Sequence, residues 1–294
     1  MTVKIIEEAY PVDTINRKVD KFSAFVRNNQ MLTLGIIGTI VIILIGIFAP
    51  LITPYDPLEH SLRSRLLPPG AEGHLLGTDQ FGRDVFTRII YAIRIDLAIG
   101  FFGVLFPLII GVLLGSVAGF FGRGIDSFIM RVLDVFTAFP YLILLIAIVA
   151  VLGPSIRNLF IALTLSGWTA FARLIRGEIL VTRELEYIEA ARSLGYSTNR
   201  IIIRHLLPNV MTPLLVFAMA DIVLTIIFSA SLSYLGLGVR PPTPEWGAMI
   251  NEGQVFLRDA WWISTFPGFA AVIVGIFLSL IGDGLADYLR PKSI

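Results

Sequence analysis

Hydrophobic residues gather in six long stretches of this chain, and polar or charged residues gather between them. Five stretches contain no charged residue, and the other contains one aspartate. A bilayer core requires roughly 17 to 25 apolar residues in helical form, so each stretch predicts a membrane-spanning helix. The fourth has only 15 residues, and its flanking arginines must extend to the interface. The stretches are 28–55, 97–122, 135–156, 158–172, 205–239 and 260–282.

This pattern predicts an all-α membrane protein with six transmembrane helices and with both termini on one side. Loops on the side of the termini hold 15 Lys and Arg residues, and loops on the other side hold 8. Basic residues favour the cytoplasmic side, so we expect cytoplasmic termini, with 1–30 as a cytoplasmic tail. No A-x-A-like cleavage site follows the first helix, 31–52, which is therefore expected to remain as an anchor.

The composition agrees with lipid as the surrounding solvent. Hydrophobic residues make up 55% of the chain and charged residues 15%, whereas soluble domains carry about 25% charged residues. A net charge of +1 offers no basic face for nucleic acid. The absence of cysteine excludes disulfides and thiolate metal ligands.

Residues 53–96 are expected to form an extracytoplasmic loop that ends in an interfacial helix. The loop is rich in Pro and Gly. Asp84 and Arg88 are spaced for an i, i+4 ion pair on the polar face of the helix. An ordinary solvated helix start is the alternative interpretation. The apolar face consists of Phe86, Ile89, Ile90 and Ile93.

The second span carries glycine at every fourth position, at Gly111, Gly115 and Gly119. Three glycines on one helix face allow another helix to approach closely. We expect packing within the chain, with packing across a dimer as the alternative. The core domain that begins with this span is predicted to comprise 97–290.

The most polar long stretch of the second half, 184–208, lies between two predicted spans. In "ELEYIEAARSLG" the charged residues lie largely away from one apolar side, as in an amphipathic helix. That side consists of Leu185, Ile188, Ala191 and Leu194. Gly195 is placed to end the helix. Ser197 or Thr198 is placed to cap a second helix, which Pro208 is expected to stop. The pattern favours a pair of cytoplasmic helices that a partner grips, and a helical connecting loop is the alternative.

This stretch resembles the EAA loop of ABC importer permeases. "EAA" is followed by three residues, Gly195, nine residues, His205 and then Leu207–Pro208. Further segments resemble the C-type subunit of the dipeptide/oligopeptide/nickel permease family. These are "HLLGTDQFGRDVFTRIIYAIR", "SLSYLGLGVRPPTPEWGAMI" and "GDGLADYLRP", and the similarity extends over about 32–291. Histidine replaces the isoleucine of the general pattern at position 205.

The resemblance implies a type I ABC importer permease fold in the cell membrane. It implies a heterodimer with a B-type permease, two cytoplasmic ATPases that bind ATP and Mg²⁺, and an extracytoplasmic solute-binding protein. The loop 233–262 would face the binding protein, with Pro241, Pro242 and Trp246 as the expected contact residues. The ATPase would grip Glu189, Ala190, Ala191, Gly195, Leu207 and Pro208.

The sequence indicates no enzyme and no cofactor or metal site. There is no G-x-x-x-x-G-K-[ST] motif for ATP. The three histidines, His60, His74 and His205, are far apart in the sequence, so no catalytic triad or metal cluster is indicated. A permease needs two arrangements of its helices, one open to each side of the membrane, and a lever through which a partner shifts it between them. It does not need to make or break covalent bonds.

Asp221 lies near the middle of the fifth predicted span. A charge at the bilayer centre costs about 2.5–3.5 kcal/mol on insertion scales. Asp221 is therefore expected to face protein or water. It either lines the solute path and meets a peptide ammonium group, or is protonated or paired for structural reasons.

The leading interpretation is a permease subunit for di- or oligopeptides. The same subunit plan also serves nickel, glutathione or oligosaccharide importers, although no His or Met cluster favours nickel. A secondary transporter would show an inverted repeat and an acid relay, and neither is apparent. A purely structural subunit would not need the 184–208 insert.

Overall fold

The computed structural model describes residues 25–71 and 73–289, and the regular structure of these residues is helical apart from two isolated bridge pairs. Five helical segments are long and apolar enough to cross a bilayer. Two shorter helices, bent by 85°, together form a sixth apolar segment, so the chain has up to six spans. The five are α3 (Gln30–Ile47), α5 (Val85–Phe121), α8 (Ile156–Thr182), α11 (Leu207–Tyr234) with its lead-in, and α13 (Trp262–Leu289), and the bent pair is α6 (Arg123–Thr137) and α7 (Tyr141–Leu152).

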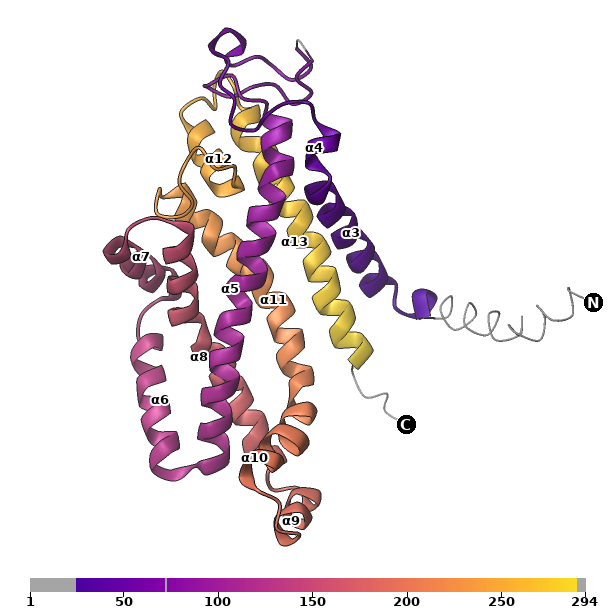
Figure 1. Ribbon diagram of the computed structural model, residues 1–294, viewed down its shortest axis with the longest axis vertical. Coiled ribbons are helices and arrows are strands. Elements are labelled where there is room, and N and C mark those ends of the chain that lie inside the picture. Colours follow the sequence, from indigo (N-terminus) through magenta and orange to yellow (C-terminus); the bar gives the residue numbers. More distant parts are fainter. Residues whose placement is uncertain (1–24, 72, 290–294) are drawn as a thin grey trace, which may run out of the picture.

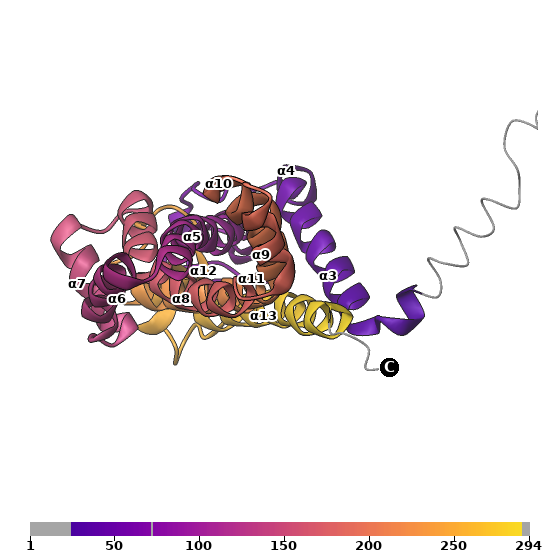
Figure 2. The ribbon, with the colours of Figure 1, turned by 90° about the horizontal axis from the view of Figure 1, so that it is seen from below.

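The helices form one elongated bundle (Figure 1). Helices α5, α8 and α11 lie in the middle, α3 and α13 on one side, and α6 and α7 on the other, as Figure 2 shows from below. Loop 53–84 and α12 (Trp246–Gln254) gather at one end, and α9 (Glu186–Ser193) projects at the other. Short helices α4 (Ala49–Ile52) and η1 (Leu62–Ser64) begin the loop.

The predicted interfacial helix is wrong as a separate element. Residues 85–96 are the first turns of the continuous 37-residue helix α5. Arg88 and the residues around it are buried by the outer loop and α12. These residues therefore contact protein and not the membrane surface that the pattern suggested. The predicted Asp84–Arg88 pair is also absent, because Asp84 caps α5 by accepting from the Thr87 amide.

The third predicted span, 135–156, differs in shape from the expectation. The segment between the second and third predicted spans is mostly helix α6, and only Gly122 separates α5 from α6. Charged residues of α6 lie on one face of an amphipathic helix, so a search for uncharged stretches misses it. Pro140, which precedes α7, stands at the bend.

The fourth span is longer than the uncharged stretch predicts. Helix α8 continues from the predicted 158–172 to Thr182, and Arg173, Arg176 and Arg183 all lie on or at the end of it. Arg176 forms a bidentate ion pair with Asp126 of α6, with an Nη2–Oδ2 distance of 2.7 Å. Paired arginines allow the helix to run on beyond the uncharged stretch.

The glycine stripe joins α5 to α8, and the prediction of packing within the chain is confirmed. A Cβ atom added at Gly111 would stand 2.9 Å from the Ala172 amide nitrogen, and one at Gly119 would stand 3.1 Å from the Arg176 carbonyl oxygen. At Gly115 a Cβ atom would overlap Ile175. The backbones therefore approach as closely as glycine allows.

The start of α3 and the end of α13, which are close to the two ends of the described part of the chain, lie side by side. A Cβ atom at Gly284 of α13 would stand 2.6 Å from the Cα atom of Leu32 at the start of α3. Both helix ends point toward the half of the bundle that carries α9 (Figure 1). Residues 1–24 of the predicted cytoplasmic tail and residues 290–294 lie outside the described residues.

Candidate functional site

The stretch 184–208 forms an elbow between α8 and α11. Helix α9 is followed by a turn at Gly195, by α10 (Thr198–Ile201) and by one π turn, η2 (Ile202–Leu206), which continues into α11. The elbow stands beyond the end of the long helices (Figure 1). We use the name elbow for 184–208 below.

The elbow turns sharply because Gly195 takes a left-handed conformation, with φ of 75°. The Gly195 amide donates to the Arg192 carbonyl at 2.9 Å, and the Tyr196 amide donates to the Ala191 carbonyl at 3.2 Å. These two bonds form a Schellman motif, which satisfies carbonyls at the end of α9. The predicted role of Gly195 as a helix terminator agrees with this geometry.

One face of the elbow is anchored in the bundle. Ile188 and Ala191 of α9 are buried in the same core cluster as Ile201 and Leu206. The opposite surface is apolar and exposed. It includes Leu185 and Leu194, which the sequence predicts on the same face as Ile188 and Ala191. Its residues are Leu185, Tyr187, Leu194 and Ile203, and Leu194 is the most open at 72% exposed.

The residues expected to meet an ATPase divide between these surfaces. Glu189 and Ala190 are exposed, and so is the Gly195 turn. Ala191 is buried and supports α9 from behind. An exposed carboxylate beside exposed apolar side chains offers a partner both a charge and a surface to bury.

The other two expected residues, Leu207 and Pro208, lie where the elbow joins α11. The prediction that Pro208 stops a helix is wrong, because the helical path runs on from Thr198 to Tyr234. Proline lacks an amide and crowds the carbonyl four residues earlier. The π turn before it accommodates this, with the Leu207 amide donating to the Ile202 carbonyl. The elbow is thus rigidly continuous with α11.

Arginines tie the elbow to its neighbours. Arg183 donates from Nη1 to the Gly119 carbonyl at 2.8 Å and from Nε to Glu184 at 2.9 Å. The Arg192 guanidinium lies 5.4 Å from the centre of the Phe120 ring. These contacts connect the elbow and the end of α8 to the end of α5.

At the opposite end of the molecule, one of the three residues expected to contact the binding protein is buried. Pro241 and Pro242 are exposed, as a contact with a binding protein requires. Trp246 is fully buried, and its Nε1 donates to the Ile89 carbonyl of α5 at 3.3 Å. Trp246 fixes α12 to α5 and does not reach the surface of this chain.

The neighbouring residues Trp261 and Trp262 differ in exposure. Trp261 is exposed, in agreement with a place in an aromatic belt, whereas Trp262 is buried. The Trp262 Nε1 donates to the Thr78 carbonyl at 3.0 Å. The indole therefore secures loop 53–84 to the start of α13.

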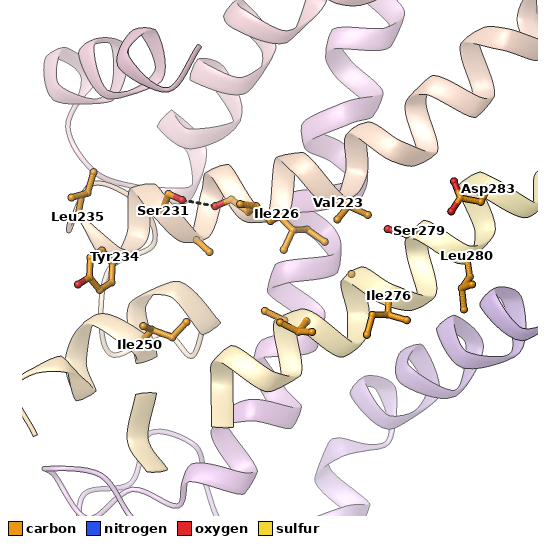
Figure 3. Close-up of a pocket in the computed structure, with 15 residues that line it drawn as sticks. Val223, Ile226, Ser231, Tyr234, Leu235, Ile250, Ile276, Ser279, Leu280 and Asp283 are labelled. Atoms are coloured by element: carbon orange, nitrogen blue, oxygen red, sulfur yellow. Dashed lines mark hydrogen bonds between the residues drawn. The ribbon is translucent and has the colours of Figure 1, made fainter. Parts of the chain in front are cut away.

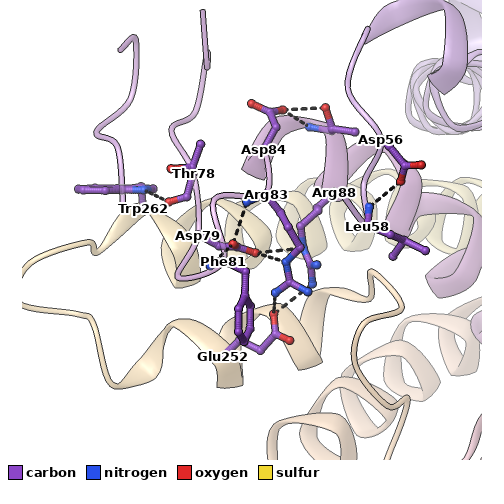
Figure 4. A network of polar contacts seen from close by, with 11 residues as sticks. Asp56, Leu58, Thr78, Asp79, Phe81, Arg83, Asp84, Arg88, Glu252 and Trp262 are labelled. Carbon is purple, nitrogen blue, oxygen red and sulfur yellow. Dashed lines mark hydrogen bonds and ion pairs between the residues drawn. The ribbon is translucent and has the colours of Figure 1, made fainter. Parts of the chain in front are cut away.

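A buried ionic cluster, missed by the sequence analysis, joins the outer loop, α5 and α12 (Figure 4). Arg83 and Arg88 both donate to Glu252 Oε2, at 2.8 and 3.1 Å. Arg83 also pairs with Asp79 at 2.6 Å. Both arginines are 1% exposed. The four charges balance. The dense polar run "GTDQFGRDVF" contains Asp79 and Arg83, whereas Arg88 and Glu252 lie outside it.

Asp221 lies half-buried on α11 and forms no ion pair within the described residues. It is absent from the lining of a neighbouring apolar cavity of about 820 Å³ between α11, α12 and α13 (Figure 3). That cavity has Tyr234 near one end and Asp283 near the other. The role of Asp221 in a solute path stays a prediction.

Comparison with known proteins identifies the family. Residues 111–294 match the family model described as "Binding-protein-dependent transport system inner membrane component". The chain is 44% identical to the dipeptide transport system permease protein DppC of Alkalihalophilus pseudofirmus, over 90% of this chain and 87% of that protein. The chain belongs to this permease family. It is therefore a multi-pass inner-membrane protein and a membrane component of a transport system.

Further similarities refine the comparison. Residues 25–69 of the permease match the N-terminal transmembrane domain of oligopeptide transport permease C. The permease is 41% identical to the glutathione transport system permease protein GsiD of Pectobacterium atrosepticum, over 91% of this chain and 89% of that protein. A chain of the inward-facing MetNI methionine ABC transporter superposes with a TM-score of 0.57 at 18% identity, over 69% of this chain and 96% of that chain. The permease thus has the type I ABC importer fold.

Proposed function

We propose that the permease is the C-type subunit of an ATP-driven importer for di- or oligopeptides and forms half of the translocation pathway. Its own chain would hydrolyse no ATP, and ATP with Mg²⁺ would be bound by two partner ATPases on the cytoplasmic side. The observation that carries the proposal is the elbow, which projects from the bundle yet continues directly into α8 and α11.

The elbow suits the role of a lever. Helix α9 presents Glu189 and Ala190 with exposed apolar neighbours, and its rear face is fixed to the core through Ile188 and Ala191. Moving a two-state equilibrium from 1:99 to 99:1 requires about 5.5 kcal/mol of differential interaction. Closure of two ATPases around such elbows is a source of that energy. The elbow then lies in the cytoplasm, together with both termini.

Peptides are the favoured solute class because similar proteins carry that name. DppC proteins of Alkalihalophilus pseudofirmus and Bacillus subtilis are dipeptide permeases by name. The similarity to GsiD keeps glutathione, itself a small peptide, as the second candidate. Nickel is less favoured, because the described residues contain no group of three His, Cys, Asp or Glu that could hold a metal ion.

A second permease would complete the pathway. The cavity between α11, α12 and α13 is open on its outer side in a single chain and is lined almost entirely by apolar residues. A B-type subunit would enclose it. Asp221 lies on α11 outside the lining of this cavity, so its carboxylate would meet a peptide ammonium group in another part of the pathway. The loop between α11 and α12, which carries Pro241 and Pro242, would meet the binding protein.

The proposal is tested by purifying the complex and by measuring peptide uptake in reconstituted vesicles. Glu189→Arg reverses an exposed charge and leaves the core untouched, so we expect loss of ATPase co-purification and loss of uptake. Glu59→Arg, at an exposed site of the outer loop, is the matched control and should change neither. Full uptake by the Glu189 variant without any bound ATPase would refute the proposal.

A further inference from the structure

Two buried carboxyl groups lie together where α12 begins. Asp96 of α5 is 2% exposed, and Glu245, the N-cap of α12, is 0% exposed. The Trp246 amide donates to Asp96 Oδ2 at 3.3 Å, and the Ala248 amide donates to Glu245 Oε2 at 2.7 Å. Because Trp246 directly follows Glu245, the Asp96 carboxyl lies against the backbone that carries Glu245.

Within 25–71 and 73–289, no positive charge balances this pair. Among the described residues, no Lys, Arg or His forms an ion pair with Asp96 or Glu245. The groups that face the pair are the other carboxyl, backbone amides of α12 and the hydroxyl of Ser233 on α11. Glu245 Oε1 has no hydrogen-bond donor. The nearby ionic cluster, by contrast, balances each carboxylate with an arginine.

Two ionised carboxylates would be costly in this setting. Like charges repel more strongly in a buried site than in water. Removal of each ion from water adds a further cost. Burial accordingly raises the pKa of the Glu245 carboxyl. A proton on one carboxyl removes the repulsion and supplies a donor for the other.

We propose that Asp96 and Glu245 together bind one proton at neutral pH, and that this shared proton holds the start of α12 against α5. The site is a proton-binding site at the outer end of the bundle. When the proton leaves, repulsion between the carboxylates pushes α12 away from α5 and loosens the buried Trp246. The inference depends on neither the solute nor the ATPases.

The sign of the pH dependence follows from the linkage between protonation and folding. The folded chain holds the proton more tightly than the unfolded chain, so the stability contribution is greatest at low pH. It falls as the pH rises from the ordinary glutamate pKa toward the raised pKa of Glu245. Replacement of either acid by its amide removes this component and retains an oxygen that accepts the same backbone amide.

Infrared spectroscopy of the purified full-length protein in lipid nanodiscs tests the proposal. A protonated carboxyl gives a carbonyl stretch distinct from carboxylate bands, and we expect one such band at neutral pH that disappears in Asp96→Asn and in Glu245→Gln. Asp259→Asn, at an exposed acid of the same outer region, should retain it. Identical bands in all four proteins would overturn the proposal.

Thermal unfolding across a pH series provides the second measurement. The wild-type melting temperature should fall as pH rises, and both amide variants should lose this dependence while Asp259→Asn keeps it. A melting temperature that follows sodium concentration instead of pH would indicate a bound cation and overturn the proposal. If the variants do not fold, the wild-type protein is labelled with carbon-13 in either its Asp or its Glu carboxyl groups. One of the two labels must then shift the frequency of the band. A band unmoved by either label contradicts the proposal.

Discussion

At the scale of single residues, the Gly195 turn sets the direction of the elbow. An L-residue in a left-handed conformation costs roughly 1–2 kcal/mol, whereas a Cβ atom at Gly195 would meet no other atom within 4 Å. Gly195→Ala should therefore destabilise α9 through backbone conformation alone, by about 1 kcal/mol. Amide hydrogen exchange in α9 should accelerate about fivefold.

Gly177→Ala is the matched control, because Gly177 lies inside α8 with open space around it and no left-handed conformation. Alanine should stabilise that helix slightly, by about 0.5–1 kcal/mol. If both variants exchanged at wild-type rates in α9, the Gly195 conformation would not constrain the elbow.

The sequence predicted residue roles well where one local rule decides them. Gly195 was recognised because a helix C-terminus needs a left-handed residue, and the Gly111–Gly119 stripe because small residues permit close helix packing. Trp246 was misplaced because its burial depends on contact with Ile89, over 150 residues earlier. Asp96 and Glu245 are similarly far apart in the sequence, so their proximity could not be predicted from it.

At the scale of helices, charge misled the prediction of where elements begin and end. The predicted spans identified all six apolar segments, yet α8 runs on through arginines that find partners on α6 and α5. Helix α5 likewise starts well before its uncharged stretch, since Arg88 is neutralised by Glu252 of α12. Such pairing requires the folded molecule and cannot be read from one segment.

The ionic cluster holds α5, α12 and the outer loop together, and its loss should be severe. Glu252→Ala leaves Arg83 and Arg88 buried with Asp79 alone. Breaking a buried pair from one side costs about 3–5 kcal/mol, which denaturant unfolding of the purified protein would measure. Asp259→Asn should remain within about 0.5 kcal/mol of wild type. Equal stability of all three proteins would show that the cluster is energetically neutral.

Arg183 connects the elbow to the end of α5, and it offers a test of transmission separate from docking. Arg183→Ala removes a charged donor from the Gly119 carbonyl, a bond of about 1.5–3 kcal/mol when well buried and of less at this partly exposed site. We expect normal ATPase co-purification with several-fold lower uptake per ATP hydrolysed, and partial recovery in Arg183→Lys. An unchanged ratio of uptake to hydrolysis would exclude Arg183 from transmission.

At the scale of the whole molecule, the bundle has two specialised ends. Buried ion pairs, Trp246 and Trp262 stiffen the end that carries the outer loop and α12, and the elbow forms the other end (Figure 1). The long helices α5, α8 and α11 run between the two ends, and glycines allow close contacts between these helices. The proposed lever requires that a force on the elbow be carried along these helices to the opposite end.

The most direct test of this account is site-specific cross-linking from the elbow. The chain contains no cysteine, so Ala190→Cys introduces a single thiol at an exposed position of α9, and Asp259→Cys places one at the opposite end. In the assembled, transport-active complex, a short thiol-reactive cross-linker should join position 190 to the ATPase and position 259 to no ATPase. An active complex in which position 190 never reaches the ATPase, or position 259 does, would contradict the account.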